Sequence, residues 1–160
     1  MIRQVFLWAA ALVLLAFAAG RIRRALASDE QTLRWTLEEL REDFNSGDVG
    51  SVASGFHPDF FDESSGADFE ATGNALRALY FQERSKDGFL LRVELPEDLL
   101  SVEVVEGADR AKVEATAQFS RLQDGHPEPW WDAKATITFA RHGGAWRILR
   151  SERVNHSARR

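Results

Sequence analysis

The chain has 160 residues, of which 44% are hydrophobic, and it carries a net charge of −5. This length allows one domain with a hydrophobic core, and the absence of cysteine excludes a disulfide framework, a thiolate metal site and a cysteine nucleophile. From Asp29 onward there are 25 acidic and 16 basic residues, a net charge of −9. Such an acidic domain argues against nucleic-acid binding, which requires a basic surface.

Residues 5–20 form an uninterrupted apolar stretch, preceded by Arg3 and followed by three arginines. One interpretation is a cleaved signal peptide, with Ala25-Leu26-Ala27 as the cleavage site. The other is an uncleaved membrane anchor, since flanking cations let a stretch somewhat shorter than ~20 residues span a bilayer. The arginines after the stretch oppose translocation. We nevertheless favour an anchor within residues 1–27, with the domain outside the cytoplasm, in the periplasm.

Three helices are predicted in the first half of the domain. The first spans 28–46, because Ser28 begins a capping pattern and apolar residues then recur at helical spacing. A short second helix is expected at 48–55. The third is expected at about 68–84, although Gly73 could delay its start by several residues.

After residue 88 the apolar residues alternate with polar ones, which predicts strands joined by short turns. The expected strands are 89–95, 99–105, 111–120, 130–141 and 145–154. Gly143-Gly144 is the clearest hairpin signal. Because short turns join consecutive strands, we expect a curved antiparallel sheet with the helices packed on one face.

This order of elements, together with four short motifs, resembles the nuclear-transport-factor-2-like (NTF2-like) superfamily and its SnoaL-like branch. The motifs are His57-Pro58-Asp59-Phe60, Gly73-Asn74-Ala75-Leu76, Asp109-Arg110-Ala111-Lys112-Val113 and Gly144-Ala145-Trp146-Arg147-Ile148. The resemblance implies an α+β, cone-shaped fold with a hydrophobic pocket between sheet and helices, often in a homodimer. It divides the chain into residues 1–27, an NTF2-like domain (28–156) and a basic tail (157–160). It implies no reaction, because one fold serves many functions.

His57 and Asp59 are the best candidates for acid–base catalysis, since imidazole and carboxylate groups can exchange protons near neutral pH. With Tyr80 as a hydrogen-bond donor, they would serve an isomerase, a cyclase or a dehydratase. The alternative, which we favour, is that His-Pro-Asp turns the chain and caps backbone groups. The predicted strands place no other proton carrier on their apolar faces, so the leading hypothesis is a non-catalytic binding domain.

A ligand pocket in such a domain would be mainly apolar. The candidate apolar lining residues are Phe60, Tyr80, Phe119, Trp130 and Trp146. Trp130 and Trp131 are adjacent, so one of them should face each side of the sheet. Alternation also places Arg150 on the face of Trp146, where it could bind an anionic head group. The alternative for Arg150 is an exposed ion pair with Glu152, worth ~0–1 kcal/mol.

No metal or cofactor is expected, because the histidines show no ligand spacing and the chain has no phosphate-binding loop. The expected partner is a small apolar molecule or another protein. The domain would bind it in the cell envelope, held at the membrane through residues 5–20.

Overall fold

The computed structural model describes residues 27–105 and 107–158, with side chains up to residue 154. The predicted membrane segment, residues 5–20, lies outside the described residues. Within the described part of the chain, no helix is both long enough and apolar enough to cross a membrane.

The helices begin and end where local capping signals place them. Helix α2 (Asp29–Ser46) begins after Ser28, whose hydroxyl accepts a hydrogen bond from the Gln31 N–H at 3.2 Å. It ends at Gly47, which has the left-handed φ of 76° that glycine adopts readily. Helices α3 (Val49–Ser54) and α4 (Phe69–Gln82) are each capped by an aspartate side chain. The three predicted helices are therefore confirmed, and α4 starts at Phe69, close to the expected residue 68.

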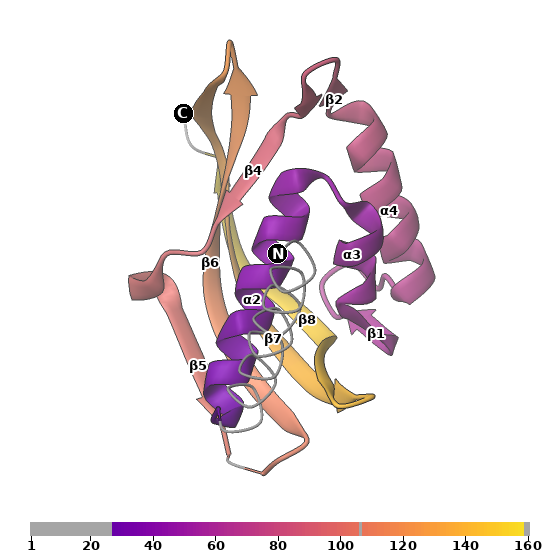
Figure 1. Cartoon of the computed structure of the whole chain (residues 1–160), viewed down its shortest axis with the longest axis vertical. Coiled ribbons are helices and arrows are strands. Elements are labelled where there is room, and N and C mark those ends of the chain that lie inside the picture. The colour runs from indigo at the N-terminus through magenta and orange to yellow at the C-terminus, as the bar shows by residue number, and fades with distance from the viewer. Residues whose placement is uncertain (1–26, 106, 159–160) are drawn as a thin grey trace, which may run out of the picture.

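Six strands form one curved sheet in the order β1–β8–β7–β6–β4, and β5 pairs with another part of β6 (Figure 1). Their bounds are β1 (Phe56–Asp62), β4 (Leu91–Glu94), β5 (Leu100–Val104), β6 (Arg110–Gln123), β7 (His126–His142) and β8 (Ala145–Ala158). The pairing is antiparallel throughout except between β1 and β8, which run parallel. Two very short strands, β2 (Arg84–Ser85) and β3 (Gly88–Phe89), form a separate hairpin.

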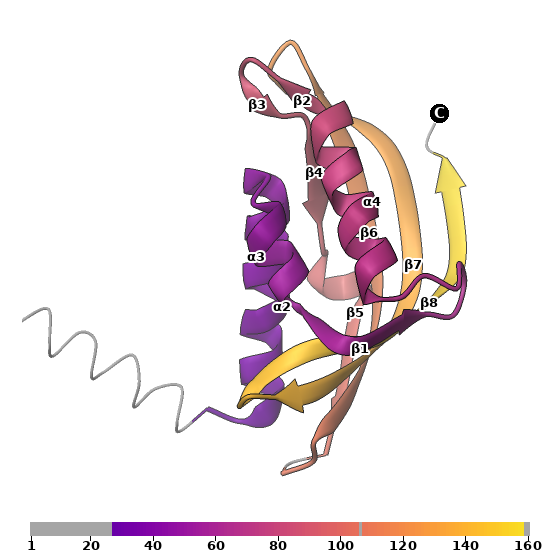
Figure 2. The ribbon, with the colours of Figure 1, turned by 90° about the vertical axis from the view of Figure 1, so that its right-hand side faces the viewer.

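The helices lie on the concave side of this sheet, which curves around them (Figure 2). Leu33 and Leu37 of α2 are buried against β6, β7 and β8. Their sheet partners include Val113 and Phe139, both fully buried, and Trp146. An α+β fold with helices on one face of a curved antiparallel sheet is thus confirmed.

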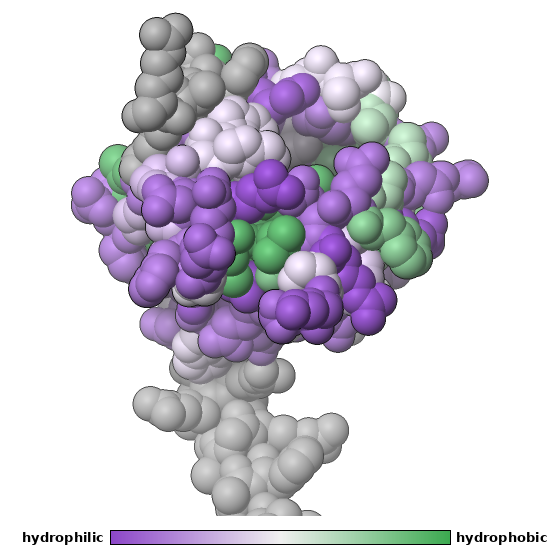
Figure 3. All heavy atoms as spheres, turned by 90° about the horizontal axis from the view of Figure 1, so that it is seen from above, coloured by the Kyte–Doolittle hydropathy of each residue, from purple (hydrophilic) through white to green (hydrophobic). Residues whose placement is uncertain are grey.

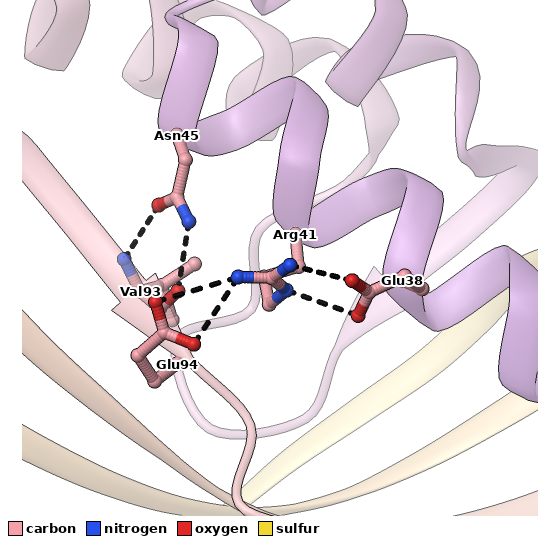
Figure 4. A network of polar contacts seen from close by, with 5 residues as sticks. All are labelled: Glu38, Arg41, Asn45, Val93 and Glu94. Atoms are coloured by element: carbon pink, nitrogen blue, oxygen red, sulfur yellow. Dashed lines mark hydrogen bonds and ion pairs between the residues drawn. The ribbon is translucent and has the colours of Figure 1, made fainter.

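Polar contacts attach α2 to the edge strand β4 (Figure 4). The Asn45 amide donates to the Val93 carbonyl at 3.0 Å, and the Val93 N–H donates to Asn45 Oδ1 at 2.7 Å. Arg41 lies between Glu38 on its own helix and Glu94 on β4, 3.1 Å from the latter. The hydrogen bond from Arg41 holds the pKa of Glu38 below its ordinary value. Because β4 pairs with β6 along its other edge, Asn45 takes the place of a missing neighbouring strand.

The structure differs most from the predicted strands at three places. The expected strand 89–95 is divided between β3 and β4, because Leu90 bonds to Glu83 through its N–H and to Leu122 through its carbonyl. Strand β7 starts at His126, four residues early, and includes Pro127 and Pro129. Proline is tolerated there because β7 pairs with β8 only from residue 131 onward, leaving one edge of this segment free. Strand β8 continues to residue 158 rather than 154.

Candidate functional site

A β-bulge in β8 decides which of its side chains face the helices. Residues opposite each other in an antiparallel pair lie on the same face of the sheet. Phe139, buried under α2, is opposite Ile148, but its neighbour Thr138 is opposite Arg150. Leu149 is therefore an extra residue, and Arg150 lies on the outer face with Thr138. Alternation alone predicted the concave face for Arg150, and that prediction is wrong because the bulge shifts the pattern by one residue.

Beyond the bulge, Ser151 and Arg153 take the concave-facing positions, opposite Ile137 and Ala135. Arg150 instead lies with its guanidinium 5.5 Å from the centre of the Phe61 ring. It also forms an ion pair with Glu63 at 3.7 Å rather than with Glu152.

Five aromatic rings form a continuous row on the concave side, which we call the aromatic row. In order of contact, with centroid separations of 5.7, 5.4, 5.9 and 5.1 Å, its members are Tyr80, Phe89, Phe44, Phe119 and Trp131. Helices α2 and α4 and strands β3, β6 and β7 each supply one ring. The row thus connects Tyr80 and Phe119, which the sequence predicted as lining residues. Phe44 and Phe89, which link them, were not among the predicted residues.

Trp131, rather than Trp130, belongs to this row. A second bulge lies in β7, where Phe119 is opposite Trp131 while the next residue, Ser120, is opposite Pro129. Trp130 is the extra residue and is 44% exposed. Trp131 stacks on Phe119 with an interplanar angle of 28°. The sequence predicted Trp130 as the lining residue, whereas the bulge places Trp131 on the concave side in its stead.

Small side chains on β6 and β7 lie next to the Trp131 end of the aromatic row. Ala117, Ala133 and Ala135 lie on the concave face, with Ala117 opposite Ala133 on the neighbouring strand. Ala117, Ala135, Phe119 and Trp131 are only half-buried, although they lie on the face that the helices cover. We call the three alanines, together with Phe119 and Trp131, the concave site. Figure 3 looks down on the end of the molecule that carries the β2–β3 and β6–β7 hairpins, where hydrophobic patches lie among hydrophilic residues.

The other end of the aromatic row is closed by packing. Tyr80 and Phe89, with apolar residues of α2, α3 and α4, surround a cavity of only about 10 Å³. A space of this size holds one water molecule at most, and its wholly apolar lining gives that water no partner. This end therefore has no room for a ligand.

His57 and Asp59 lie far from the concave site. His57 Nδ1 accepts a hydrogen bond from the Asp59 N–H at 3.0 Å, and the His57 ring packs edge-on against His142 at 4.8 Å. The Asp59 side chain is 85% exposed. His142 is eleven residues from Trp131 along β7, roughly 36 Å of extended strand. The structure therefore does not bring His57, Asp59 and Tyr80 to one cavity, and the contact at Asp59 caps a backbone group.

Phe60 and Trp146 are core residues. Phe60 is 4% exposed and packs edge-on against Phe56 at 4.7 Å. Trp146 is 2% exposed, and its indole N–H donates to the Thr32 hydroxyl at 3.1 Å. Arg141 lies 4.3 Å from the centre of the Trp146 ring and pairs with Asp29. Trp146 and Arg141 border a surface cleft of about 360 Å³ between α2 and the β7–β8 hairpin, separate from the concave site.

Asp62 is the carboxylate that the fold places next to the concave face, opposite Ser151. It accepts hydrogen bonds from the Ser151 hydroxyl at 2.8 Å and from both the N–H and the hydroxyl of Ser65. Burial acts to raise the pKa of Asp62, but these hydrogen bonds outweigh burial and hold the pKa below its ordinary value. A carboxylate so stabilised in its charged form is poorly suited to accept a proton near neutral pH. Among the described residues, no group of three potential ligands could hold a metal ion.

No family model matches the chain, and no curated protein matches it in sequence. Solved structures do match. An NTF2-like protein with a cystatin-like fold from Novosphingobium aromaticivorans is 21% identical with a TM-score of 0.59, and the match covers 87% of this chain and 88% of that one. Aln2 from a Streptomyces species is 17% identical with a TM-score of 0.64, over 80% and 92% of the two chains.

Bd1075 from Bdellovibrio bacteriovorus is also 17% identical, with a TM-score of 0.60. That match covers 78% of this chain but only 40% of Bd1075, so this chain corresponds to less than half of that protein. At such low identities these matches establish the fold and leave function open. The comparisons thus agree with the resemblance found in the sequence: the chain has an NTF2-like fold.

Proposed function

We propose that this chain is a non-catalytic NTF2-like domain that binds a small apolar molecule at the concave site. The observation that carries the proposal is the incomplete burial of Ala117, Ala135, Phe119 and Trp131 on the face that the helices cover. Apolar side chains that stay accessible in a concave region are typical of ligand sites. A partner protein is the other occupant that the sequence predicted, but a patch of five side chains is far smaller than a stable protein interface, which favours a small molecule.

The arrangement of proton carriers supports binding without chemistry. An acid–base mechanism needs its groups within hydrogen-bond reach of one substrate. His57 lies at the opposite end of β7 from Trp131, beside His142. Asp62 already accepts three hydrogen bonds and is held in its charged form. Neither group is placed to exchange a proton with a molecule held by Trp131.

The ligand site can be tested with two neighbouring substitutions on opposite faces of β7. Ala135→Leu adds bulk to the concave site, whereas Thr136→Leu adds similar bulk to the outer face. Binding of the neutral apolar fluorophore N-phenyl-1-naphthylamine should weaken by about tenfold or more in Ala135→Leu, a change of about 1.4 kcal/mol, and by less than about twofold in Thr136→Leu. Equal affinities in the two variants would contradict the proposed site.

We further propose that residues 5–20 tether the domain to a membrane, with the domain in the periplasm. The support is the uninterrupted apolar stretch with arginines on both sides. A reporter enzyme that is active only outside the cytoplasm, fused to the C-terminus, should be active. A fusion that works only with a cytoplasm-specific reporter would contradict this orientation.

A further inference from the structure

We propose that the ligand of the concave site carries an anionic group, a carboxylate, and that Arg153 binds it. This inference rests on the proposed function and specifies the chemical class of the ligand. It comes from the bulge at Leu149, which exchanges the faces of the two arginines near the end of β8. Without the bulge, Arg150 would face the helices; with it, Arg153 takes that position, opposite Ala135 of the concave site.

The backbone of Arg153 is fixed by a hydrogen bond, and its charged side chain has no ion-pair partner among the described residues. Its N–H donates to the Ser64 hydroxyl at 2.6 Å, which fixes this part of β8 against the loop after β1. Its side chain is exposed, and it forms no ion pair with any described residue. Arg150, by contrast, pairs with Glu63 and lies over Phe61. Arg153 thus carries an exposed guanidinium at a position whose partner on β7 is Ala135 of the concave site.

The acidic residues nearest to Arg153 in the sheet do not form an ion pair with it. Glu152 is opposite Thr136 and therefore lies on the outer face. Asp62 is next to Ser151, and its oxygens accept hydrogen bonds from Ser151 and Ser65 rather than from Arg153. The donors of Arg153 therefore remain available to a ligand.

These positions match an amphipathic acid. A guanidinium binds a carboxylate through two parallel hydrogen bonds, which makes arginine the preferred partner for that group. Ala135, opposite Arg153, lies four positions along β7 from Trp131, about 13 Å of strand. A medium-chain fatty acid of comparable length could place its carboxylate at Arg153 and its tail over the alanines, ending at the Phe119–Trp131 stack.

The test compares decanoate with decanol, which share an apolar chain and differ in the charged group. Both are titrated calorimetrically into the purified chain and into the variants Arg153→Gln and Arg150→Gln, with protein-free buffer of the same preparation as the blank. The wild type should bind decanoate about tenfold or more tightly than decanol, because hydrogen bonds to charged groups are the strong ones. Arg153→Gln should lose this preference while still binding decanol, and Arg150→Gln should retain it.

The outcomes separate this inference from the proposed function. Equal binding of decanoate and decanol by the wild type would overturn the inference and leave the apolar site standing. A preference that survives in Arg153→Gln, or that disappears in Arg150→Gln, would overturn the assignment to Arg153. Failure of both ligands to bind would overturn the proposed function together with the inference.

Discussion

Replacing Asn45 by alanine should loosen the attachment of α2 to the edge strand β4. The Asn45 amide both donates to the Val93 carbonyl, at 3.0 Å, and accepts from the Val93 N–H, at 2.7 Å. Both contacts are partly buried and join residues 48 positions apart in the chain. Asn45→Ala removes both at once and leaves the two backbone groups of Val93 without a protein partner.

The expected loss of stability follows from these two hydrogen bonds. Each contributes about 0.5–1.5 kcal/mol net, so Asn45→Ala should lower the free energy of unfolding by about 2 kcal/mol. For a domain of this size, that corresponds to a fall in Tm of roughly 8 °C. Ser46→Ala is the matched control, because its exposed hydroxyl makes only local contacts, donating to the Asp43 carbonyl and accepting from the Asp48 N–H at 3.4 Å. Its effect should stay within about 0.5 kcal/mol.

Urea unfolding of the three proteins measures these differences, and amide hydrogen exchange locates them. The Val93 amide should exchange much faster in Asn45→Ala than in the wild type, because β4 pairs with β6 only along its other edge. A loss below about 0.5 kcal/mol, or a Val93 amide that stays equally protected, would refute the view that Asn45 acts as a substitute strand.

Two further predictions concern backbone packing and pH. Gly47→Ala should cost about 2–4 kcal/mol, because a Cβ there would lie 2.9 Å from both Phe89 and Tyr80 in addition to straining a left-handed backbone. Gly66→Ala has a similar φ and an open surrounding, so it should cost about 1 kcal/mol, and equal losses in urea unfolding would contradict the close contact. Asp62→Asn should cost about 1–2 kcal/mol at pH 7. Because folding lowers the pKa of Asp62, its stabilisation is present above the unfolded pKa, near 4, and lost as the pH falls through the folded value. The difference between wild type and variant in unfolding experiments should therefore shrink in acid, and a difference that persists there would disprove the role of the charge.

The sequence predicted the features that depend on neighbouring residues. Ser28 caps the first helix through a contact within one turn, as predicted, and the short second helix begins where it was expected, after residue 48. Alternation likewise predicted the concave face of β6, where Val113 and Ala115 are buried. These signals are local, so they can be read without knowing the rest of the fold.

The candidate site was predicted only in part, because its geometry depends on strand register. One extra residue moves every following side chain to the other face, and no local pattern marked Leu149 or Trp130 as extra. Only the structure could therefore show which of the two adjacent tryptophans faces the helices. The same holds for Arg153, rather than Arg150, lying on the concave face. The packing of His57 against His142, 85 positions away, was equally invisible in the sequence.

Chemical-shift mapping of the isotopically labelled chain with decanol tests the central claim most directly. If the concave site binds small apolar molecules, the largest chemical-shift changes should be at the amides of its five residues and at the ring protons of Trp131 and Phe119. The signals of Trp130 should change little. Shifts confined to the cleft beside Trp146, or no saturable shifts at all, would contradict the account.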